Sequence, residues 1–189
     1  HDFRPDYLNI GRLRRELENP PCLALTATAT ARVQTDLCER LSLHDPLRLV
    51  TGFRRPNLAL SVRQCRSRQE KLAQLERVVR EYPTGTLLIY CATRRAVEEV
   101  AACLSRSHSS VGYYHAGLSD EERRSVHEEF RVGTIRILAA TNAFGMGIDK
   151  SDVRLVVHFD IPGSLEAYYQ EVGRAGRDGQ PATCLLLFH

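Results

Sequence analysis

The sequence contains very little lysine, and this scarcity bears on what the protein could bind. Only Lys71 and Lys150 among its 26 basic residues are lysines, which leaves 24 arginines. Arginine binds phosphate better than lysine because its planar guanidinium pairs with two oxygens at once, although we attribute most of the excess to codon bias. The formal net charge of +3 over 189 residues is too small to establish a nucleic-acid partner by itself.

The sequence also lacks the cysteine pairs of common zinc and redox motifs. No two of its six cysteines lie within four residues of each other, so it contains no C-x-x-C pair. Several lie in apolar runs, such as Cys91, which follows residues 87–90 (LLIY). We therefore expect buried, reduced thiols of a cytosolic protein, and no zinc site.

Further absences narrow the functional class. No apolar run approaches the length of a membrane span, so we predict no membrane partner. No G-x-G-x-x-G motif opens a helix after an early strand, which argues against a dinucleotide-binding dehydrogenase. The chain begins HDFRP, without a signal peptide or an initiating methionine, and we expect it to be an internal piece of a longer protein.

The sequence does contain a regular alternation of short apolar runs and amphipathic segments. The apolar runs predict strands at 22–25, 47–50, 58–62, 87–91, 111–115, 135–140, 153–159 and 182–188. Helical periodicity predicts helices at 6–17, 67–82, 94–104, 119–131 and 165–172, and one that ends near 41. Ser67 and Ser119 each have capping-box spacing to a glutamate. Apolar strands that alternate with helices indicate an α/β fold, with a parallel sheet covered on both faces.

The loops that follow the predicted strands carry the polar residues of interest. Ligands of parallel sheets bind in loops just past the carboxyl ends of the strands. Loops of this kind lie at 26–28, 91–94, 115–117 and 141–150. Together with the stretch 170–179 (QEVGRAGRDG), we expect them to form a single edge rich in hydroxyls, glycines and arginines.

The stretch 170–179 has the composition of a phosphate-binding segment. Glycine recurs at every third position from Gly173 to Gly179, and Arg174 and Arg177 lie between these glycines. Glycine lets the backbone approach another group closely, and each guanidinium can pair with phosphate oxygens. The alternative, a glycine-rich turn with two solvated arginines, loses weight because of the neighbouring stretches.

Four stretches resemble the motifs of superfamily 2 helicases. Residues 25–29 (LTATA) resemble motif III, 89–94 (IYCATR) motif IV, 140–150 (ATNAFGMGIDK) motif V and 168–179 (YYQEVGRAGRDG) motif VI. Their sequences are similar to those of RecQ DNA helicases in particular, and so is the sequence of residues 114–118 (YHAGL). Residues 1–5 (HDFRP) resemble the end of the aromatic-rich loop of that family. The resemblance spans nearly the whole chain in the family's order.

The resemblance implies a RecA-like α/β fold and a motor of two such domains with ATP between them. Residues 1–55 would be the C-terminal part of the first domain, and residues 56–189 would be the second domain. Thr26 and Thr28 would couple the two domains, with capping of the next helix as the alternative for Thr28. The family's Walker A lysine and magnesium-binding acids belong to the first domain, and this sequence has no G-K-[ST] motif. ATP and Mg²⁺ are the implied cofactors, with the Mg²⁺ ligands outside this chain.

The resemblance also implies roles around the nucleotide. Arg177 matches the arginine finger that reaches the γ-phosphate, and Arg174 matches a second phosphate or interdomain contact. Gln170 would orient this network. Asp149 could accept hydrogen bonds from the ribose or hold Arg177, with a plain turn aspartate as the alternative, and Gly147 would permit close backbone approach.

The residues with an implied DNA contact come from four of these stretches: Phe3, Arg4, Thr93, Arg94, His115, Thr141 and Asn142. Thr141 and Asn142 could instead contact the residues of motif VI. Phe3 would stack on a base of single-stranded DNA, or else anchor a core before Pro5. Thr93 begins a predicted helix, whose free amides suit a phosphate, and could instead be a plain cap. A histidine that closes a strand, as His115 does, is more often a structural hydrogen-bonding residue.

The implied activity is ATP-dependent translocation along single-stranded DNA, with unwinding of forked duplexes. A single-strand-binding protein or recombination factors would be partners of the full-length protein, in the bacterial cytoplasm at the nucleoid or in a eukaryotic nucleus. Two rival functions stay open. One is a DEAD-box RNA helicase, whose motif VI usually reads H-R-x-G-R, and the other is a motor-derived module that binds nucleic acid without hydrolysis.

The chain by itself is expected not to hydrolyse ATP, because it has the arginines of motif VI without the phosphate-binding lysine loop or the magnesium acids. The measurement is phosphate release by the purified chain with and without single-stranded DNA. Turnover above a buffer blank that rises with DNA would contradict this expectation.

Overall fold

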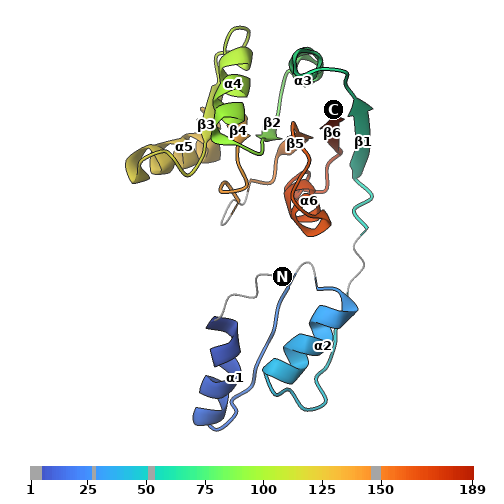
Figure 1. Cartoon of the computed structure of the whole chain (residues 1–189), viewed down its shortest axis with the longest axis vertical. Coiled ribbons are helices and arrows are strands. Elements are labelled where there is room, and N and C mark those ends of the chain that lie inside the picture. The colour runs from blue at the N-terminus through green and yellow to red at the C-terminus, as the bar shows by residue number, and fades with distance from the viewer. Residues whose placement is uncertain (1–5, 27–28, 51–53, 146–149) are drawn as a thin grey trace. The chain divides into compact units, whose positions relative to one another are not determined.

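The computed structural model describes residues 6–26, 29–50, 54–145 and 150–189, with side chains from residue 9 onward. The chain forms two compact units, His1–Arg54 and Arg55–His189, which appear as the blue part and the green-to-red part of Figure 1. In the described residues, no helix is long and apolar enough to cross a membrane.

The first unit contains two helices, α1 (Asp6–Glu16) and α2 (Ala31–Arg40). Gly11 allows them to approach closely, because a Cβ at this position would lie 2.0 Å from the carbonyl oxygen of Arg40. Thr30 caps α2, since its side-chain oxygen accepts a hydrogen bond from the Val33 amide at 3.4 Å. Both helices therefore form where the sequence predicts them.

The strands predicted at 22–25 and 47–50 are not present, and those two predictions are wrong. Leu23 and Leu25 are 81% and 83% exposed, and Leu47 and Leu49 are also exposed. A strand needs a neighbouring strand to pair its backbone groups, and the described part of this unit contains no strand. The apolar runs predicted buried strands, but the described part of this unit leaves their leucines exposed.

The second unit contains one parallel sheet of six strands. They are β1 (Leu58–Gln64), β2 (Thr86–Tyr90), β3 (Val111–Tyr114), β4 (Ile137–Ala140), β5 (Val153–His158) and β6 (Ala182–Phe188). Their order is β1-β6-β5-β2-β4-β3, and every pairing is parallel. The predicted α/β fold with a parallel sheet is confirmed.

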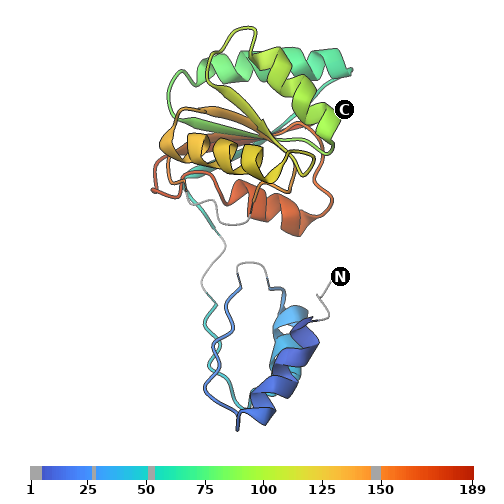
Figure 2. The same cartoon turned by 90° about the vertical axis from the view of Figure 1, so that its left-hand side faces the viewer.

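Helices cover both faces of this sheet (Figures 1 and 2). The helices α3 (Arg68–Glu81) and α4 (Arg94–Leu104) share one apolar layer with Leu87 and Ile89 of β2. The helices α5 (Asp120–Val132) and α6 (Leu165–Val172) share the other layer with Leu88 and Tyr90. Successive side chains of a strand point to opposite faces, so β2 is buried on both sides.

The predicted helix starts differ in detail. The capping box at Ser119 forms, with the Glu122 carboxylate accepting a hydrogen bond from the Ser119 amide at 2.8 Å. Ser67 also caps its helix, but the Glu70 carboxylate accepts from the amide of Arg66 at 2.7 Å instead. The capping box predicted at Ser67 therefore forms only in part, because its carboxylate binds the amide one residue before Ser67.

The six cysteines are free thiols that differ in burial. Cys65, Cys91 and Cys184 are buried, as predicted, and burial raises the pKa of Cys184 to about 12. Cys22 is exposed, contrary to the prediction, because residues 22–25 do not form the expected buried strand. The described residues contain no group of three His, Cys, Asp or Glu side chains that could hold a metal ion.

Replacing Ser119 by alanine is expected to lower the free energy of unfolding by about 1 kcal/mol, because the first turn of α5 loses its cap. The exposed Ser109 has no hydrogen bond among the described residues, so Ser109→Ala should change stability by less than about 0.5 kcal/mol. Urea denaturation of both variants tests this. Equal midpoints for the two variants would show that the box does not stabilise α5.

Candidate functional site

The loop after β2 lies at the carboxyl edge of the sheet and holds Thr93 and Arg94. The Thr93 hydroxyl oxygen accepts a hydrogen bond from the Ala96 amide at 3.1 Å and so caps α4. Asp160, just past β5, accepts from the Ala92 amide at 3.0 Å and pairs with Lys71 at 3.3 Å. The Arg94 side chain is exposed at the start of this helix, where free backbone amides attract anions.

His115 lies beside this loop and is engaged within the protein. Its Nδ1 accepts a hydrogen bond from the Gly117 amide at 3.2 Å, which leaves the Nε2 hydrogen for the Glu98 carboxylate at 3.1 Å. The residue is only 5% exposed. A contact of His115 with DNA would therefore require one of these bonds to break. A Cβ at Gly117 would lie 3.0 Å from Nη1 of Arg94, so the two loops are in contact.

Thr141 and Asn142 follow β4 at the same edge. Thr141 is buried, and its amide donates to the carbonyl oxygen of Tyr114, at the end of β3, at 3.1 Å. Asn142 is exposed. The structure thus brings the predicted residues of three loops together at the carboxyl edge.

The backbone of the stretch with the two arginines leaves that edge by Gly176, and the prediction of a single edge is wrong for this part of the stretch. Because α6 runs antiparallel to the strands, it returns the chain to their amino ends. There the Gly176 amide donates to the carbonyl oxygen of Val153, the first residue of β5, at 2.9 Å. The Ala182 amide donates to the Asn57 carbonyl oxygen, just before β1, at 3.0 Å.

Arg174 nevertheless reaches the residues that follow β4. A Cβ at Gly145 would lie 2.7 Å from Nη2 of Arg174, so the guanidinium is in close contact with that backbone. The guanidinium also hydrogen-bonds the Tyr90 hydroxyl, which donates to the carbonyl oxygen of Phe144 at 3.4 Å. Burial raises the pKa of Tyr90 far above its ordinary value, and the charges of Arg174 and Arg177 partly oppose that rise.

Arg177 and Gln170 are both exposed, and Arg174 is half-buried. The predicted role of Gln170 in orienting the arginines stays a prediction, because within the described residues its side chain makes no hydrogen bond. Arg174 Nε is buried and has no hydrogen-bond partner among the described atoms. The arginine pair therefore consists of one side chain held under the loop of residues 141–145 and one at the surface.

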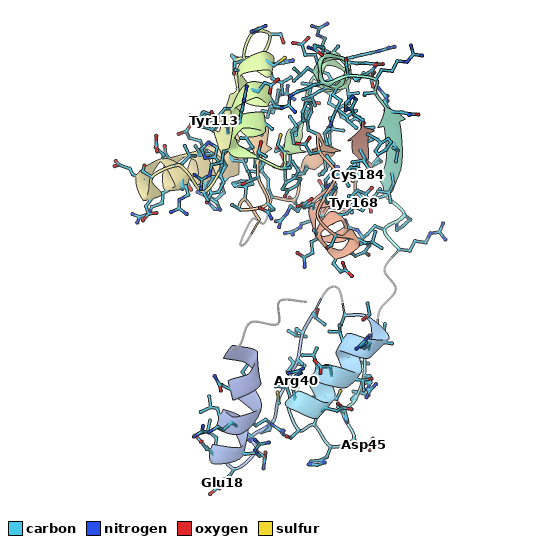
Figure 3. All side chains as sticks on the ribbon, in the orientation of Figure 1. Glu18, Arg40, Asp45, Tyr113, Tyr168 and Cys184 are labelled. Carbon is cyan, nitrogen blue, oxygen red and sulfur yellow. The ribbon has the colours of Figure 1, made fainter. Side chains whose placement is uncertain are left out.

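Sequence analysis missed a buried pair beside these arginines. Nε2 of His158, at the end of β5, is 2.8 Å from a carboxylate oxygen of Glu171 on α6. The two residues are 0% and 8% exposed. The His158 ring stacks on Tyr90 at 5.6 Å and lies 4.9 Å from the ring of Tyr168, which Figure 3 labels on α6. In the sequence, this pair was indicated only by an ionisable residue in an apolar strand, His158, and another on the apolar side of a helix, Glu171.

Five of the predicted site residues lie outside the described residues: Phe3, Arg4, Thr28, Gly147 and Asp149. Thr26 is described and exposed, in the first unit.

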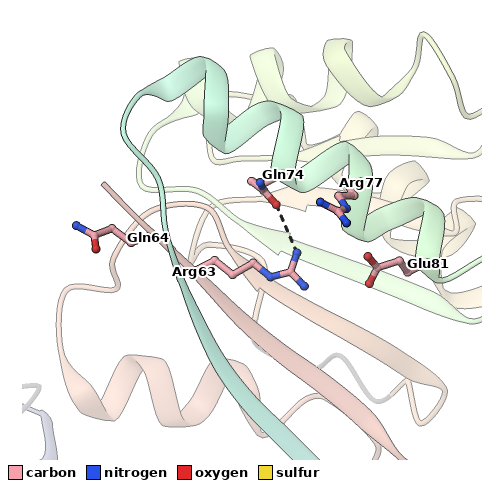
Figure 4. A pocket seen from close by; sticks show the side chains of 5 residues that line it. All are labelled: Arg63, Gln64, Gln74, Arg77 and Glu81. Carbon is pink, nitrogen blue, oxygen red and sulfur yellow. Dashed lines mark hydrogen bonds between the residues drawn. The ribbon is translucent and has the colours of Figure 1, made fainter.

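The second unit also has a polar recess of about 390 Å³ between β1 and α3. It is lined by Arg63 and Gln64 of β1 and by Gln74, Arg77 and Glu81 of α3, as Figure 4 shows. Arg63 donates to the Gln74 side chain at 3.5 Å. None of the predicted site residues lines this recess.

The known proteins to which this chain is similar in sequence are helicases. Residues 70–179 match the family described as the helicase conserved C-terminal domain. The probable ATP-dependent DNA helicase RecS of Bacillus subtilis is 42% identical over 188 residues, which cover 99% of this chain and 38% of that protein. The ATP-dependent helicase SGS1 of Saccharomyces cerevisiae is 41% identical over 188 residues, which cover 100% of this chain and 13% of that protein.

Among solved structures, that of S. cerevisiae Dbp5 bound to RNA and ADP BeF3 has a TM-score of 0.79 and 22% identity. The match covers 95% of this chain and 48% of that chain. At this identity the likeness shows the fold alone, which is that of a RecA-like helicase domain.

The buried pair gives a stability prediction. Glu171→Ala should lower the free energy of unfolding by about 1–3 kcal/mol, because the buried His158 ring loses a hydrogen-bond partner. Glu166→Ala, an exposed carboxylate on the same helix, is the matched control and should cost less than about 1 kcal/mol. Denaturant unfolding of both variants measures the difference, and equal losses would show that the pair does not stabilise the unit.

Proposed function

Because the chain belongs to the helicase conserved C-terminal domain family, with RecQ-type DNA helicases as its relatives, we propose that it is part of an ATP-dependent DNA helicase motor. Residues 1–55 would be the end of the first RecA-like domain, and residues 56–189 would be the second. The chain spans 38% of RecS and 13% of SGS1, so the proposed activity is that of a full-length protein. That protein would couple ATP hydrolysis to translocation on single-stranded DNA and to duplex unwinding.

The observation that carries this proposal is the arrangement of Arg174 and Arg177. Arg174 is held by the Tyr90 hydroxyl and by close contact with Gly145, and Arg177 is exposed on a loop whose backbone bonds to the sheet. Charge placed in advance where a phosphoryl group develops negative charge needs no rearrangement during the reaction. We assign Arg177 the role of the finger on the γ-phosphate, and Arg174 a second phosphate or interdomain contact.

The residues of the chain suit a phosphate-bearing cofactor, and ATP with Mg²⁺ supplies the reacting phosphate. The guanidiniums of Arg174 and Arg177 are the groups that would pair with phosphate oxygens. Gly147, Asp149 and Gln170 complete the proposed nucleotide contacts. The sequence has no G-K-[ST] motif, so the phosphate-binding lysine and the Mg²⁺ ligands would come from outside this chain. No zinc is proposed in it.

DNA would lie along the carboxyl edge of the sheet in the second unit. Arg94 and Asn142 are exposed there, beside the capped start of α4, and a helix start offers backbone amides to a phosphate. Thr93 and Thr141 would add contacts to DNA from the same loops. His115 is a weaker candidate for a DNA contact, because its ring already binds the Gly117 amide. In the first unit, Phe3 and Arg4 would sense single-stranded DNA, and Thr26 and Thr28 would couple its binding to ATP hydrolysis.

The relatives favour DNA over RNA as the substrate. The proteins that match at 41–42% identity are named DNA helicases or helicases, whereas the likeness to Dbp5 at 22% concerns the fold. Forked and single-stranded DNA are therefore the proposed substrates, with a single-strand-binding protein or recombination factors as partners. The proposed location is wherever that DNA lies, the nucleoid or the nucleus.

In the full-length protein, Arg177→Ala should reduce kcat for DNA-stimulated ATP hydrolysis about a thousandfold or more, while ATP affinity changes by less than about tenfold. Arg124, an exposed arginine of α5 without a partner among the described residues, is the control. Its alanine variant should keep kcat within about twofold of wild type.

Two other outcomes of that experiment would change the proposal. Near-normal turnover of Arg177→Ala would make Arg174 the candidate finger. Absence of any DNA-stimulated turnover in the wild-type protein would instead favour the nucleic-acid-binding module without hydrolysis.

A further inference from the structure

The segment that joins the two units makes specific contacts that its sequence did not explain. We call residues 54–57 (RRPN) the connector; they lie between the apolar runs 47–50 and 58–62. Arg55 is the first residue of the second unit, and β1 begins three residues later at Leu58. Both Arg55 and Asn57 are half-buried, whereas the adjacent Arg54 is exposed.

Arg55 and Asn57 bind the backbone of the loop that carries Arg177. Nη2 of Arg55 donates to the carbonyl oxygens of Ala175 and Gly176 at 3.1 and 2.8 Å. Nδ2 of Asn57 donates to the carbonyl oxygens of Gly176 and Gln180 at 2.8 and 2.9 Å. The side chains of the connector therefore hold the backbone on both sides of Arg177.

The loop is shaped to receive these side chains. Gly176 has a φ of +55°, which favours glycine, and a Cβ there would lie 2.6 Å from Nδ2 of Asn57 and 2.7 Å from the Gln180 carbonyl oxygen. Ala175 and Gly176 are buried, whereas residues 177–180 are exposed. Packing thus fixes the loop up to Gly176. Beyond it the backbone is held by polar contacts, which also include the ion pair between Arg154 and Asp178.

We propose that Arg55 and Asn57 are positioning residues for Arg177. The proposal rests on the proposed role of Arg177 as the finger, and adds that the connector sets its position. Loss of the Arg55 bonds would free the carbonyls of residues 175 and 176 and let the loop move. Because a displacement of about 1 Å can cost about a hundredfold in rate, turnover should respond even where the fold does not.

The central experiment compares Arg55→Gln with Arg54→Gln in the full-length protein. Arg55→Gln should lower kcat for DNA-stimulated ATP hydrolysis about 10- to 100-fold with KM for ATP within about threefold of wild type. Arg54→Gln removes the same charge one residue earlier and should keep kcat within about twofold. Asn57→Ala, which removes two bonds without removing a charge, should lower kcat like Arg55→Gln.

A double substitution tests whether Arg55 acts through Arg177. If it does, Arg55→Gln in an Arg177→Ala background should lower kcat by less than about twofold, because the residue it positions is already absent. A further 10-fold or larger loss would mean an independent role and would overturn the proposal. So would a normal kcat in both Arg55→Gln and Asn57→Ala, or a lowered melting temperature with kcat unchanged.

The same data separate this proposal from the function on which it rests. Near-normal turnover of Arg177→Ala refutes the finger itself. A strong effect of Arg177→Ala with none from Arg55→Gln or Asn57→Ala refutes only the positioning role. If Arg55→Gln fails to fold, Asn57→Ala and the conservative Arg55→Lys, which keeps the charge and one set of donors, decide the question by the same kcat criterion.

Discussion

The burial of β2 on both faces is the constraint on which the second unit depends. Leu87 and Ile89 complete one apolar layer, and Leu88 and Tyr90 complete the other. The alternation places a phenol inside an apolar layer, where a hydroxyl needs hydrogen-bond partners. Tyr90 finds them in the Phe144 carbonyl oxygen and the Arg174 guanidinium. A requirement of the core thus brings together two segments that the proposed chemistry needs.

The direction of α6 separates the proposed sites within this unit. The loops after β2, β3 and β4 lie at the carboxyl edge, where Arg94 and Asn142 are exposed. The backbone at Gly176 lies at the amino ends of the strands, because α6 carries the chain back across the sheet. The buried pair of His158 and Glu171 joins α6 to the carboxyl end of β5. One core can therefore hold the residues proposed to contact DNA and the backbone beside Arg177 at different ends of the strands.

Most of the fold could be predicted from the sequence, because helices and strands depend on neighbouring residues. Every strand and helix of the second unit forms close to its predicted place, and the Ser119 cap forms as its spacing indicates. The failures concern segments whose burial depends on distant partners. Residues 22–25 and 47–50 are apolar enough for strands, yet the described part of their unit offers no strand to pair with.

The sequence by itself determined the identity of the motifs and the residue types suited to bind phosphate, since both lie in contiguous stretches such as 170–179. Only the tertiary structure decided which of these residues meet. Arg55 contacts a carbonyl oxygen 121 residues away, and Tyr90 contacts Arg174, which lies 84 residues further along the sequence. Such contacts follow from the order of the strands and the direction of α6. Local periodicity cannot encode either, because both are set by how apolar faces pack over the whole unit.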